Sequence, residues 1–249
     1  MTTQKVITVT DIKKQFDREI VLDNIGFSVE QGEILGVLGP SGSGKTTLIK
    51  CIVGMHRLDA GHLEIMGRKM PDIDLMDSIG YMAQMDALYE DLTGMQNLVF
   101  FARLKGMKKK GALQEARQLF KLVNLEKDTD KKVVNYSGGM KRRLSLIAAL
   151  IGDPDVIILD EPTVGIDPVL RELFWAEFYR RQNRGKTIII TTHAMDEADK
   201  CSRLLLLRGG KILENGTPGD MKKAYGLSSI EQIFIESAKE DDRQKEAAL

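Results

Sequence analysis

The chain carries no excess charge of either sign. Its 249 residues contain 36 Lys and Arg against 36 Asp and Glu, which gives a formal net charge of zero. A protein that holds nucleic acid through its phosphates needs a basic surface. The composition therefore disfavours nucleic acid as the main partner, although it leaves room for local basic patches.

Long apolar runs are also missing. No stretch approaches the ~20 apolar residues of a membrane span. The N-terminal segment MTTQKVITVTD lacks the basic start and apolar run of a secretory signal. We expect that the chain itself neither crosses a membrane nor is exported.

Cysteine is scarce. Cys51 and Cys201 are far apart within apolar segments, and their spacing does not suggest a metal site. We interpret both as reduced core thiols, which favours a reducing, cytoplasmic setting.

Apolar residues are plentiful, at 43%, and their pattern predicts an α/β fold. The first thirty residues alternate as half-buried strands do, which indicates an antiparallel β layer. Residues 156–161 and 186–193 are apolar on both faces, as are central strands of a covered parallel sheet. Further strand patterns occur at 62–67, at 79–84 and in a hairpin that turns at Gly209 and Gly210.

Residues 84–154 contain helical periods only, such as MQNLVFFARLKG and ALQEARQLFKLV. They are predicted to form a helical lobe inserted into the α/β core. We expect one domain over residues 1–226, with the helical subdomain at about 85–153, followed by a C-terminal helix and charged tail over 227–249.

Two cap signals start the last helices. Thr217 with Pro218 predicts one helix, and Ser228, three residues before Glu231, predicts the other. The charged end AKEDDRQKEAAL, from residue 238, is predicted to fray.

The segment GPSGSGKT matches the pattern G-x-x-x-x-G-K-[ST] between a predicted strand and a helix that Gly54 can end. Its glycines let backbone N–H groups surround phosphate oxygens, Lys45 adds positive charge, and the Thr46 hydroxyl can bind Mg²⁺. The alternative is a glycine-rich turn with a structural role only. We interpret the segment as a nucleotide phosphate loop, with contacts from Gly39, Pro40, Ser41, Gly42, Ser43, Gly44, Lys45, Thr46 and Thr47.

A second motif, VIILDEP, is a buried strand that ends in two acids. Asp160 is placed to hold hydrated Mg²⁺ beside a phosphate loop. Glu161 is then the candidate general base for attack of water on the γ-phosphate. A capping acid at a strand end is the alternative for either residue.

The segment NYSGGMKRRL poses a contradiction, because a helix is predicted to start near Ser137. Two glycines and three cations, Lys141, Arg142 and Arg143, occupy its start, where the helix dipole is already positive. Either these cations are solvated surface charge or the helix start awaits an anion that this chain does not supply.

Around YSGGM the sequence resembles the ATP-binding cassette family, whose signature loop is centred on Ser-Gly-Gly. The resemblance covers nearly the whole chain in the right motif order. It identifies Gln84 with the Q-loop glutamine, which implies metal and catalytic contacts, and Asp167 with the D-loop aspartate. It further identifies His193 with the switch histidine and Phe16 with the aromatic residue against adenine. Taken one at a time, these residues also fit plain structural roles.

The resemblance implies that two cassettes pair head to tail, as a homodimer or a heterodimer. Ser137, Gly138 and Gly139 of one subunit would close over the γ-phosphate held by the other. Arg143 is hypothesised to help this closure, while surface charge is as good an interpretation for Lys141 and Arg142. Tyr136 replaces the commoner leucine, and Met140 replaces the commoner glutamine.

Ser137 follows Thr46 by only about ninety residues, which leaves no room for the long coiled coil of chromosome and repair members. The resemblance therefore implies an ATPase subunit of a membrane transporter that uses ATP and Mg²⁺. It would lie peripherally on the inner face of the cell membrane through a permease. Leu98, Phe100 and Phe101 are expected to be partly open beside the family's groove for a permease helix.

The signature region and the tail SSIEQIFIE resemble ATPases of ABC-2-type exporters of drugs, antibiotics, lipids or polysaccharides. An importer ATPase is the alternative, and a non-transport ATP-driven clamp is a further one. The cargo is chosen by the partner and is not encoded in these motifs.

Overall fold

The computed structural model describes residues 4–85 and 87–247, and the chain divides into two compact units. The first unit comprises Met1–Pro71 and Ile189–Leu249, and the second comprises Asp72–Ile188. Among the described residues, no helix combines the length and apolar character needed to span a membrane.

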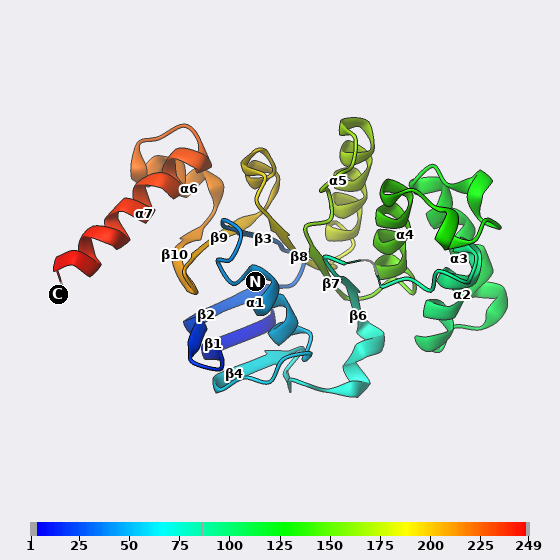
Figure 1. Ribbon diagram of the computed structural model, residues 1–249, viewed down its shortest axis with the longest axis horizontal. Helices are drawn as coiled ribbons and strands as arrows, with labels where there is room; N and C mark the ends of the chain where they lie inside the picture. The colour runs from blue at the N-terminus through cyan, green and yellow to red at the C-terminus, as the bar shows by residue number, and fades with distance from the viewer. Residues whose placement is uncertain (1–3, 86, 248–249) are drawn as a thin grey trace. The chain divides into compact units, whose positions relative to one another are not determined.

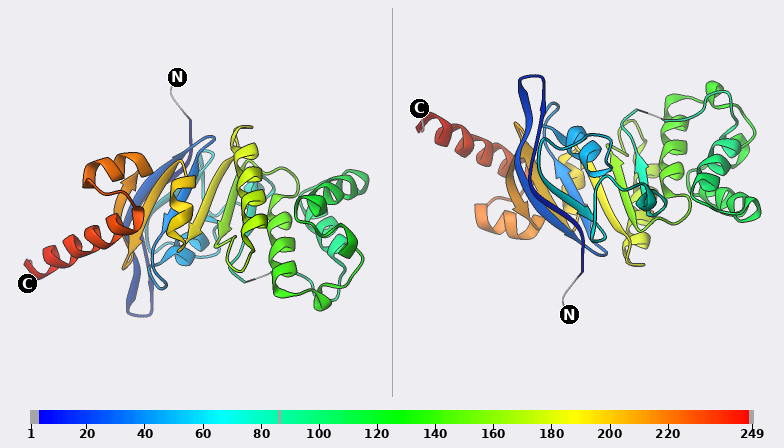
Figure 2. Two further views of the ribbon diagram at one scale, coloured as in Figure 1. Left: turned by 90° about the horizontal axis from the view of Figure 1, so that it is seen from above. Right: turned by 90° about the horizontal axis from the view of Figure 1, so that it is seen from below.

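An antiparallel layer in the first unit has the strand order β2-β1-β4-β5 (Figure 1). Alternation in the sequence builds it, because every second residue turns a side chain toward the core. Ile7 and Val9 of β1 are buried, for example, whereas Thr8 is half-buried and Thr10 is exposed. Figure 2 shows β1 and β2 as one long hairpin. The strands are β1 (Lys5–Phe16), β2 (Glu19–Glu30), β4 (Ala60–Ile65) and β5 (Arg68–Lys69).

The second sheet of this unit has the order β10-β9-β3-β8. Strand β3 (Ile34–Leu38) is buried throughout and runs parallel to β9 (Arg203–Arg208). Strand β10 (Lys211–Gly216) returns antiparallel after the turn at Gly209 and Gly210, which confirms the predicted hairpin. Strand β8 (Thr187–Thr192) is buried at every position, and its first two residues belong to the second unit.

Helix α1 (Lys45–Ile52) follows β3, and Gly54 lies in the left-handed region just after its end, as expected. After β8 come the short 3₁₀ helix η4 (Met195–Lys200), α6 (Pro218–Tyr225) and α7 (Ile230–Ala247). Thr217 caps α6 as predicted, since its hydroxyl accepts from the backbone N–H of Asp220.

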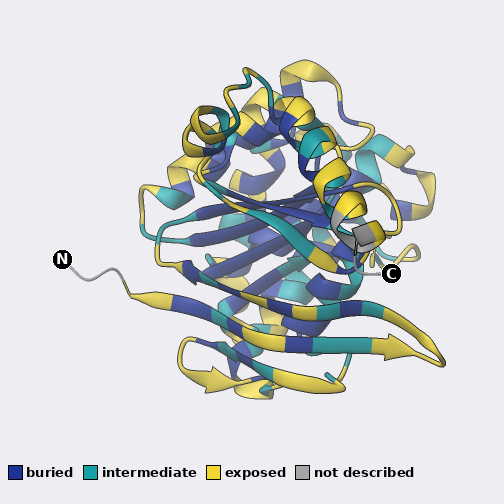
Figure 3. Ribbon diagram, turned by 90° about the vertical axis from the view of Figure 1, so that its left-hand side faces the viewer, coloured by how far each residue is buried: buried dark blue, intermediate teal, exposed yellow. Residues whose placement is uncertain are grey.

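Two predictions about the C-terminal segment are wrong. The cap of α7 is Ser229 and not Ser228, because the Ser229 hydroxyl accepts from the N–H of Gln232 at 3.2 Å. The charged end does not fray within the described residues, since α7 continues to Ala247. Arg208 fixes it with hydrogen bonds to the Ala238 carbonyl and the Asp242 carboxylate, at 2.9 and 2.7 Å. Figure 3 shows this helix with a mostly exposed outer face.

The second unit holds two parallel strands and a helical lobe. Strands β6 (Ile79–Met82) and β7 (Val156–Asp160) pair in register from Ile79 with Val156 to Met82 with Leu159. The described residues between these two strands form helices and turns, with one isolated bridge from Thr93 to Lys132. The helices of the unit are η1 (Ile73–Ser78), α2 (Gly94–Leu104), α3 (Lys109–Leu122), η2 (Glu126–Asp128), η3 (Val133–Asn135), α4 (Gly138–Leu150) and α5 (Pro168–Gln182).

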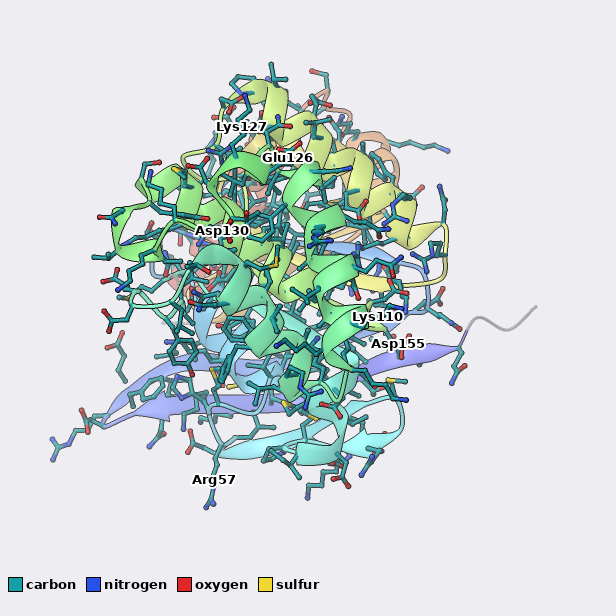
Figure 4. All side chains as sticks on the ribbon, turned by 90° about the vertical axis from the view of Figure 1, so that its right-hand side faces the viewer. Arg57, Lys110, Glu126, Lys127, Asp130 and Asp155 are labelled. Carbon is teal, nitrogen blue, oxygen red and sulfur yellow. The ribbon has the colours of Figure 1, made fainter. Side chains whose placement is uncertain are left out.

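Helices α2, α3 and α4 pack against one another around a core that includes Leu98, Phe120, Leu144 and Ile147, all with no exposed surface. Leu98 was expected to be partly open, and this is wrong, because it faces the inside of the lobe. Charged side chains cover the outer surface, and Figure 4 shows Lys110, Glu126, Lys127 and Asp130 there.

Both cysteines are buried free thiols, as expected from the sequence. Burial raises the pKa of Cys51 to about 11 and that of Cys201 to about 12. The thiolate, which is the reactive form, is therefore scarce at neutral pH.

Candidate functional site

The phosphate loop (residues 39–46) joins β3 to α1 in the first unit. Lys45 turns back into the loop, where its Nζ donates to the carbonyl oxygens of Gly39 and Pro40 at 2.7 and 3.0 Å. Gly44 precedes the helix in a left-handed conformation (φ 103°), without a side-chain cap. A helix start without a side-chain cap can present its backbone N–H groups to an anion.

The loop glycines are required for different reasons. A Cβ on Gly39 would overlap the carbonyl oxygen of Leu207 and lie 2.7 Å from the Ser43 hydroxyl. Gly42 and Gly44 have positive φ values of 79° and 103°, which favour glycine.

The Ser43 hydroxyl is buried and has no hydrogen-bond partner among the described residues. A buried polar group of this kind is costly unless a ligand or water satisfies it. Beside it, Ser41 is exposed, and Thr46 and Thr47 are half-buried on the first turn of α1. These residues fit an oxygen-rich anion such as a phosphate.

Two further predicted residues lie in the first unit. Phe16 ends β1, with 41% of its surface exposed and its ring edge-on to that of His56, with the centroids 5.2 Å apart. Lys14 lies 5.1 Å from the ring centroid, so the aromatic face already attracts a cation. His193 is exposed directly after β8.

The second unit places the two acids at the end of β7. Asp160 is the last residue of the strand and has no exposed surface, whereas Glu161 is half-buried. Glu161 has φ 53°, the left-handed region that residues with side chains rarely adopt. Such conformations cost about 1–3 kcal/mol and persist where the surroundings impose them, often at functional sites.

Gln84 lies two residues beyond β6, with an exposed side chain. The residues assigned to a metal are Thr46, Gln84 and Asp160, which offer oxygen atoms. Hydroxyl, amide and carboxylate oxygens suit Mg²⁺, which prefers hard oxygen ligands. The donor set therefore fits this ion.

The signature segment (residues 135–144) starts α4, as predicted. Ser137 is the N-cap, and its hydroxyl accepts from the N–H of Met140 at 3.3 Å. A Cβ built on Gly138 or Gly139 meets no atom of the described residues within 4 Å. The surface over this helix start is therefore open to an approaching group. Asp167 caps α5 in the same unit, accepting from the N–H of Leu170 at 3.1 Å.

The three cations of this segment have protein partners. Lys141 pairs with Glu90 at 2.5 Å, and Arg143 donates to the carbonyl oxygens of Gly139 and Val123 at 3.2 and 3.0 Å. Arg142 is only 9% exposed and donates to backbone carbonyls at the ends of β6 and β7. Solvated surface charge is thus the wrong interpretation for Arg142. The helical period offered a signal, because Arg142 falls three residues before the buried Ser145.

Tyr136, which stands where leucine is commoner, is accommodated by its surroundings. Its hydroxyl donates to the Asp128 carbonyl at 2.6 Å, and burial raises the pKa of this phenol to about 12. A Cβ on Gly94 would collide with the same hydroxyl. The helical lobe therefore has space and a hydrogen-bond acceptor for tyrosine at this position. The sequence alone did not predict these contacts.

The predicted residues thus fall into two groups. The first unit carries the phosphate loop, Phe16 and His193. The second carries Gln84 and the two acids, joined through Arg142, together with the signature segment and Asp167.

Comparisons with known proteins show the family of this chain. The family model described as ABC transporter matches residues 22–164. A Nod factor export ATP-binding protein I from Burkholderia lata is 40% identical over 215 residues, which covers 85% of this chain and 71% of that protein.

Solved structures are similar over almost the full fold. An ATP-binding subunit of an ABC transporter superposes with a TM-score of 0.88 at 26% identity, covering 94% of this chain and 99% of that one. The dimeric bacterial ABC transporter cassette MJ0796 superposes with a TM-score of 0.79 at 25% identity, covering 85% of this chain and 98% of that one. The predicted α/β class, a nucleotide-binding core with an antiparallel β layer and an inserted helical lobe, is confirmed.

Proposed function

Because this chain belongs to the ABC transporter family and is one of its ATP-binding, ATP-hydrolysing cassettes, we propose that it powers export through a separate membrane permease. The observation that carries this proposal is the 40% identity, over 85% of the chain, to an ATPase named for Nod factor export. The cargo class we propose is that of ABC-2-type exporters, namely a drug, antibiotic, lipid or polysaccharide.

We propose that residues 1–226 form the ATPase domain, with a helical subdomain at about 85–153, and that 227–249 add a C-terminal helix and tail. The phosphate loop would hold the nucleotide phosphates through its backbone N–H groups and Lys45. The exposed Phe16 ring would stack on adenine.

Thr46, Gln84 and Asp160 would hold Mg²⁺, which would supply positive charge to offset that of the phosphates during hydrolysis. Glu161 would accept a proton from the attacking water as general base, a contribution of about 10²–10⁴ in rate. Gln84 and His193 would orient the water and the γ-phosphate. The left-handed backbone at Glu161 supports this assignment, because strained residues gather at functional sites.

A second cassette would complete the site. The open surface over Gly138 and Gly139 and the exposed Ser137 fit a γ-phosphate presented by a partner's phosphate loop. Asp167, exposed at the start of α5, would contact the same partner. The dimeric state of MJ0796 supports pairing.

The permease would dock on the helical lobe and hold the subunit at the inner face of the membrane. Phe100 and Phe101 are half-buried beside the 50% exposed Tyr89, with ring centroids 4.8 and 6.2 Å from it. A small cavity of about 70 Å³ adjoins Phe101, between Ala83 and Leu88. Aromatic anchors beside a cavity suit a short apolar helix of a partner.

Glu161→Gln tests the catalytic assignment. This variant should bind Mg-ATP, stop hydrolysing it and accumulate as an ATP-bound dimer in size-exclusion chromatography. Glu126→Gln, at an exposed acid of the same unit, should behave as wild type. Hydrolysis at the wild-type rate by Glu161→Gln would remove this residue from catalysis.

Ser137→Ala tests closure between subunits. It should leave nucleotide affinity unchanged and lower turnover, and normal turnover would refute the pairing.

Export itself is tested by co-purification. A permease with several membrane spans that co-purifies with this chain supports export, whereas a solute-binding protein would indicate import.

A further inference from the structure

Arg142 joins two segments of the second unit that the sequence separates widely. One terminal nitrogen of its guanidinium donates to the carbonyl oxygens of Ala83 and Gln84 at 3.1 and 2.9 Å. The other donates to the carbonyl oxygen of Asp160 at 2.7 Å and to that of Glu161. Four backbone acceptors therefore converge on one buried side chain.

These contacts begin where the strand pairing stops. The last paired residues of β6 and β7 are Met82 and Leu159. Ala83 and Asp160 come next, and the guanidinium donates to the backbone carbonyl of each, so it links the two segments where the strand pairing ends. Arginine suits this role, because its planar fork carries five donors and stays charged at any pH that a protein experiences.

The backbone of Glu161 depends on its surroundings. Its left-handed φ of 53° is rare for a residue with a side chain and needs contacts that impose it. The hydrogen bond from Arg142 to the Glu161 carbonyl is such a contact. Without it, the peptide can rotate to an ordinary conformation and carry the carboxylate away.

We propose that Arg142 is a positioning residue for hydrolysis: it sets the Glu161 carboxylate relative to the Gln84 segment, so that movement of either segment is passed to the other. This inference rests on the proposed catalytic role of Glu161. A partner that displaces residues 83–84 would therefore change the turnover rate through the side chain of Arg142.

Arg181 provides a matched control. It is as well buried, at 3% exposed, and lies in the same unit. Its donors bind the side-chain carboxylates of Glu177 and Asp153, at 2.7 and 3.2 Å. Asp153 precedes the start of β7, whereas Asp160 and Glu161 lie at the end of that strand. Loss of this arginine should weaken the fold without moving Glu161.

The experiment compares Arg142→Lys with Arg181→Lys in the full chain. Lysine keeps the charge but cannot span four carbonyls. Arg142→Lys should lower kcat by about 10- to 100-fold, since small misplacements of a catalytic group have effects of this size, and should leave the Kd for Mg-ATP within about threefold. Arg181→Lys should lower Tm and keep kcat at temperatures well below Tm.

Amide hydrogen exchange adds a readout that a purely structural role would not move. Amide exchange at residues 83–85 and at Asp160 and Glu161 should rise together in Arg142→Lys and stay unchanged in Arg181→Lys. Should Arg142→Lys fail to fold, Arg142→Gln, which retains two donors on a shorter side chain, carries the same comparison.

The inference is overturned if kcat of the Arg142 variant equals that of Arg181→Lys, or if neither segment exchanges faster. Glu161→Gln, measured alone, separates the two hypotheses. If it is inactive while Arg142→Lys retains wild-type kcat, only the inference fails. If it hydrolyses ATP normally, the role of Glu161 fails and the positioning role fails with it.

Discussion

Two glycine-rich turns in this chain lead directly into helices, and in both cases the helix carries positive charge near its start. In the phosphate loop the cation points inward, where Lys45 binds the carbonyls of Gly39 and Pro40. In the signature segment the cations turn away from the open helix start, and Arg142 binds carbonyls behind it. A similar string of glycines and cations therefore adopts two different local structures.

The glycines differ as well. Gly39 is packed so tightly that a methyl group has no space, whereas Gly139 borders open space. The first turn of α1 has no side-chain cap, while Ser137 caps α4. One turn thus leads into a helix without a side-chain cap, and the other leads into a capped helix whose glycines border open space.

Among these variants, Gly139→Ala should have the largest effect, and it tests whether the open surface of the signature segment is used in turnover. Alanine fits the open space and favours the helix by up to ~1 kcal/mol, so Tm should rise or stay constant. Yet turnover should fall by about 10²–10³, because the added methyl group would keep the partner's γ-phosphate away from the backbone N–H donors, with an effect similar to the loss of one donor to a transition-state charge. Calorimetry and steady-state ATPase assays check both signs. Full activity would show that nothing approaches this face.

Lys45→Ala should weaken binding of Mg-ATP by about 10- to 100-fold, because hydrogen bonds to charged groups contribute about 1.5–3 kcal/mol. Titration calorimetry measures the Kd. Lys141→Ala is the matched control in the other turn and should leave the Kd unchanged. Equal losses in the two variants would contradict the distinction between the turns.

Gly39→Ala should destabilise the fold by about 1–3 kcal/mol, the usual cost of overpacking, because its Cβ meets the Leu207 backbone. Denaturant unfolding without nucleotide measures this effect. Gly42→Ala, at a position with no neighbour within 4 Å among the described residues, controls for the positive φ alone. A smaller loss for Gly39→Ala than for Gly42→Ala would refute the packing explanation.

Lys141→Ala should have the smallest effect on the free energy of unfolding. Its partner Glu90 is largely exposed, and such ion pairs contribute about 0–1 kcal/mol. Urea unfolding at low and high salt checks this, and the difference between wild type and variant should shrink with salt. A loss above about 2 kcal/mol would mean that this cation supports the fold.

Much of the fold could be predicted because its signals are local. The alternation in β1, the buried run of β7, the cap at Thr217 and the stop at Gly54 each depend on residues near in sequence. The cap of α7 was predicted at Ser228 and lies at Ser229, which is an error of one residue. The tail prediction failed because Arg208, distant in sequence, fixes Asp242.

For the candidate site, residue identities came from motif spacing, whereas the partners of the cations did not. Lys141 to Arg143 are adjacent, yet one faces Glu90, one the ends of two strands and one the loop after α3. The helical period indicates that Arg142 faces inward, but it does not identify the groups that each of the three cations contacts. Leu98 was misjudged for the same reason, because the neighbours that bury it come from other helices.

The sequence by itself determined the family, the nucleotide chemistry and most of the elements, since glycine geometry, periodicity and caps act over a few residues. Tertiary structure alone decided that Arg142 lies behind the signature segment, where it joins the ends of β6 and β7. The reason is that the buried guanidinium needs hydrogen-bond acceptors, and the nearest carbonyl oxygens follow the last paired residues of the two strands. These carbonyls belong to residues about twenty and sixty positions away from Arg142 in the sequence.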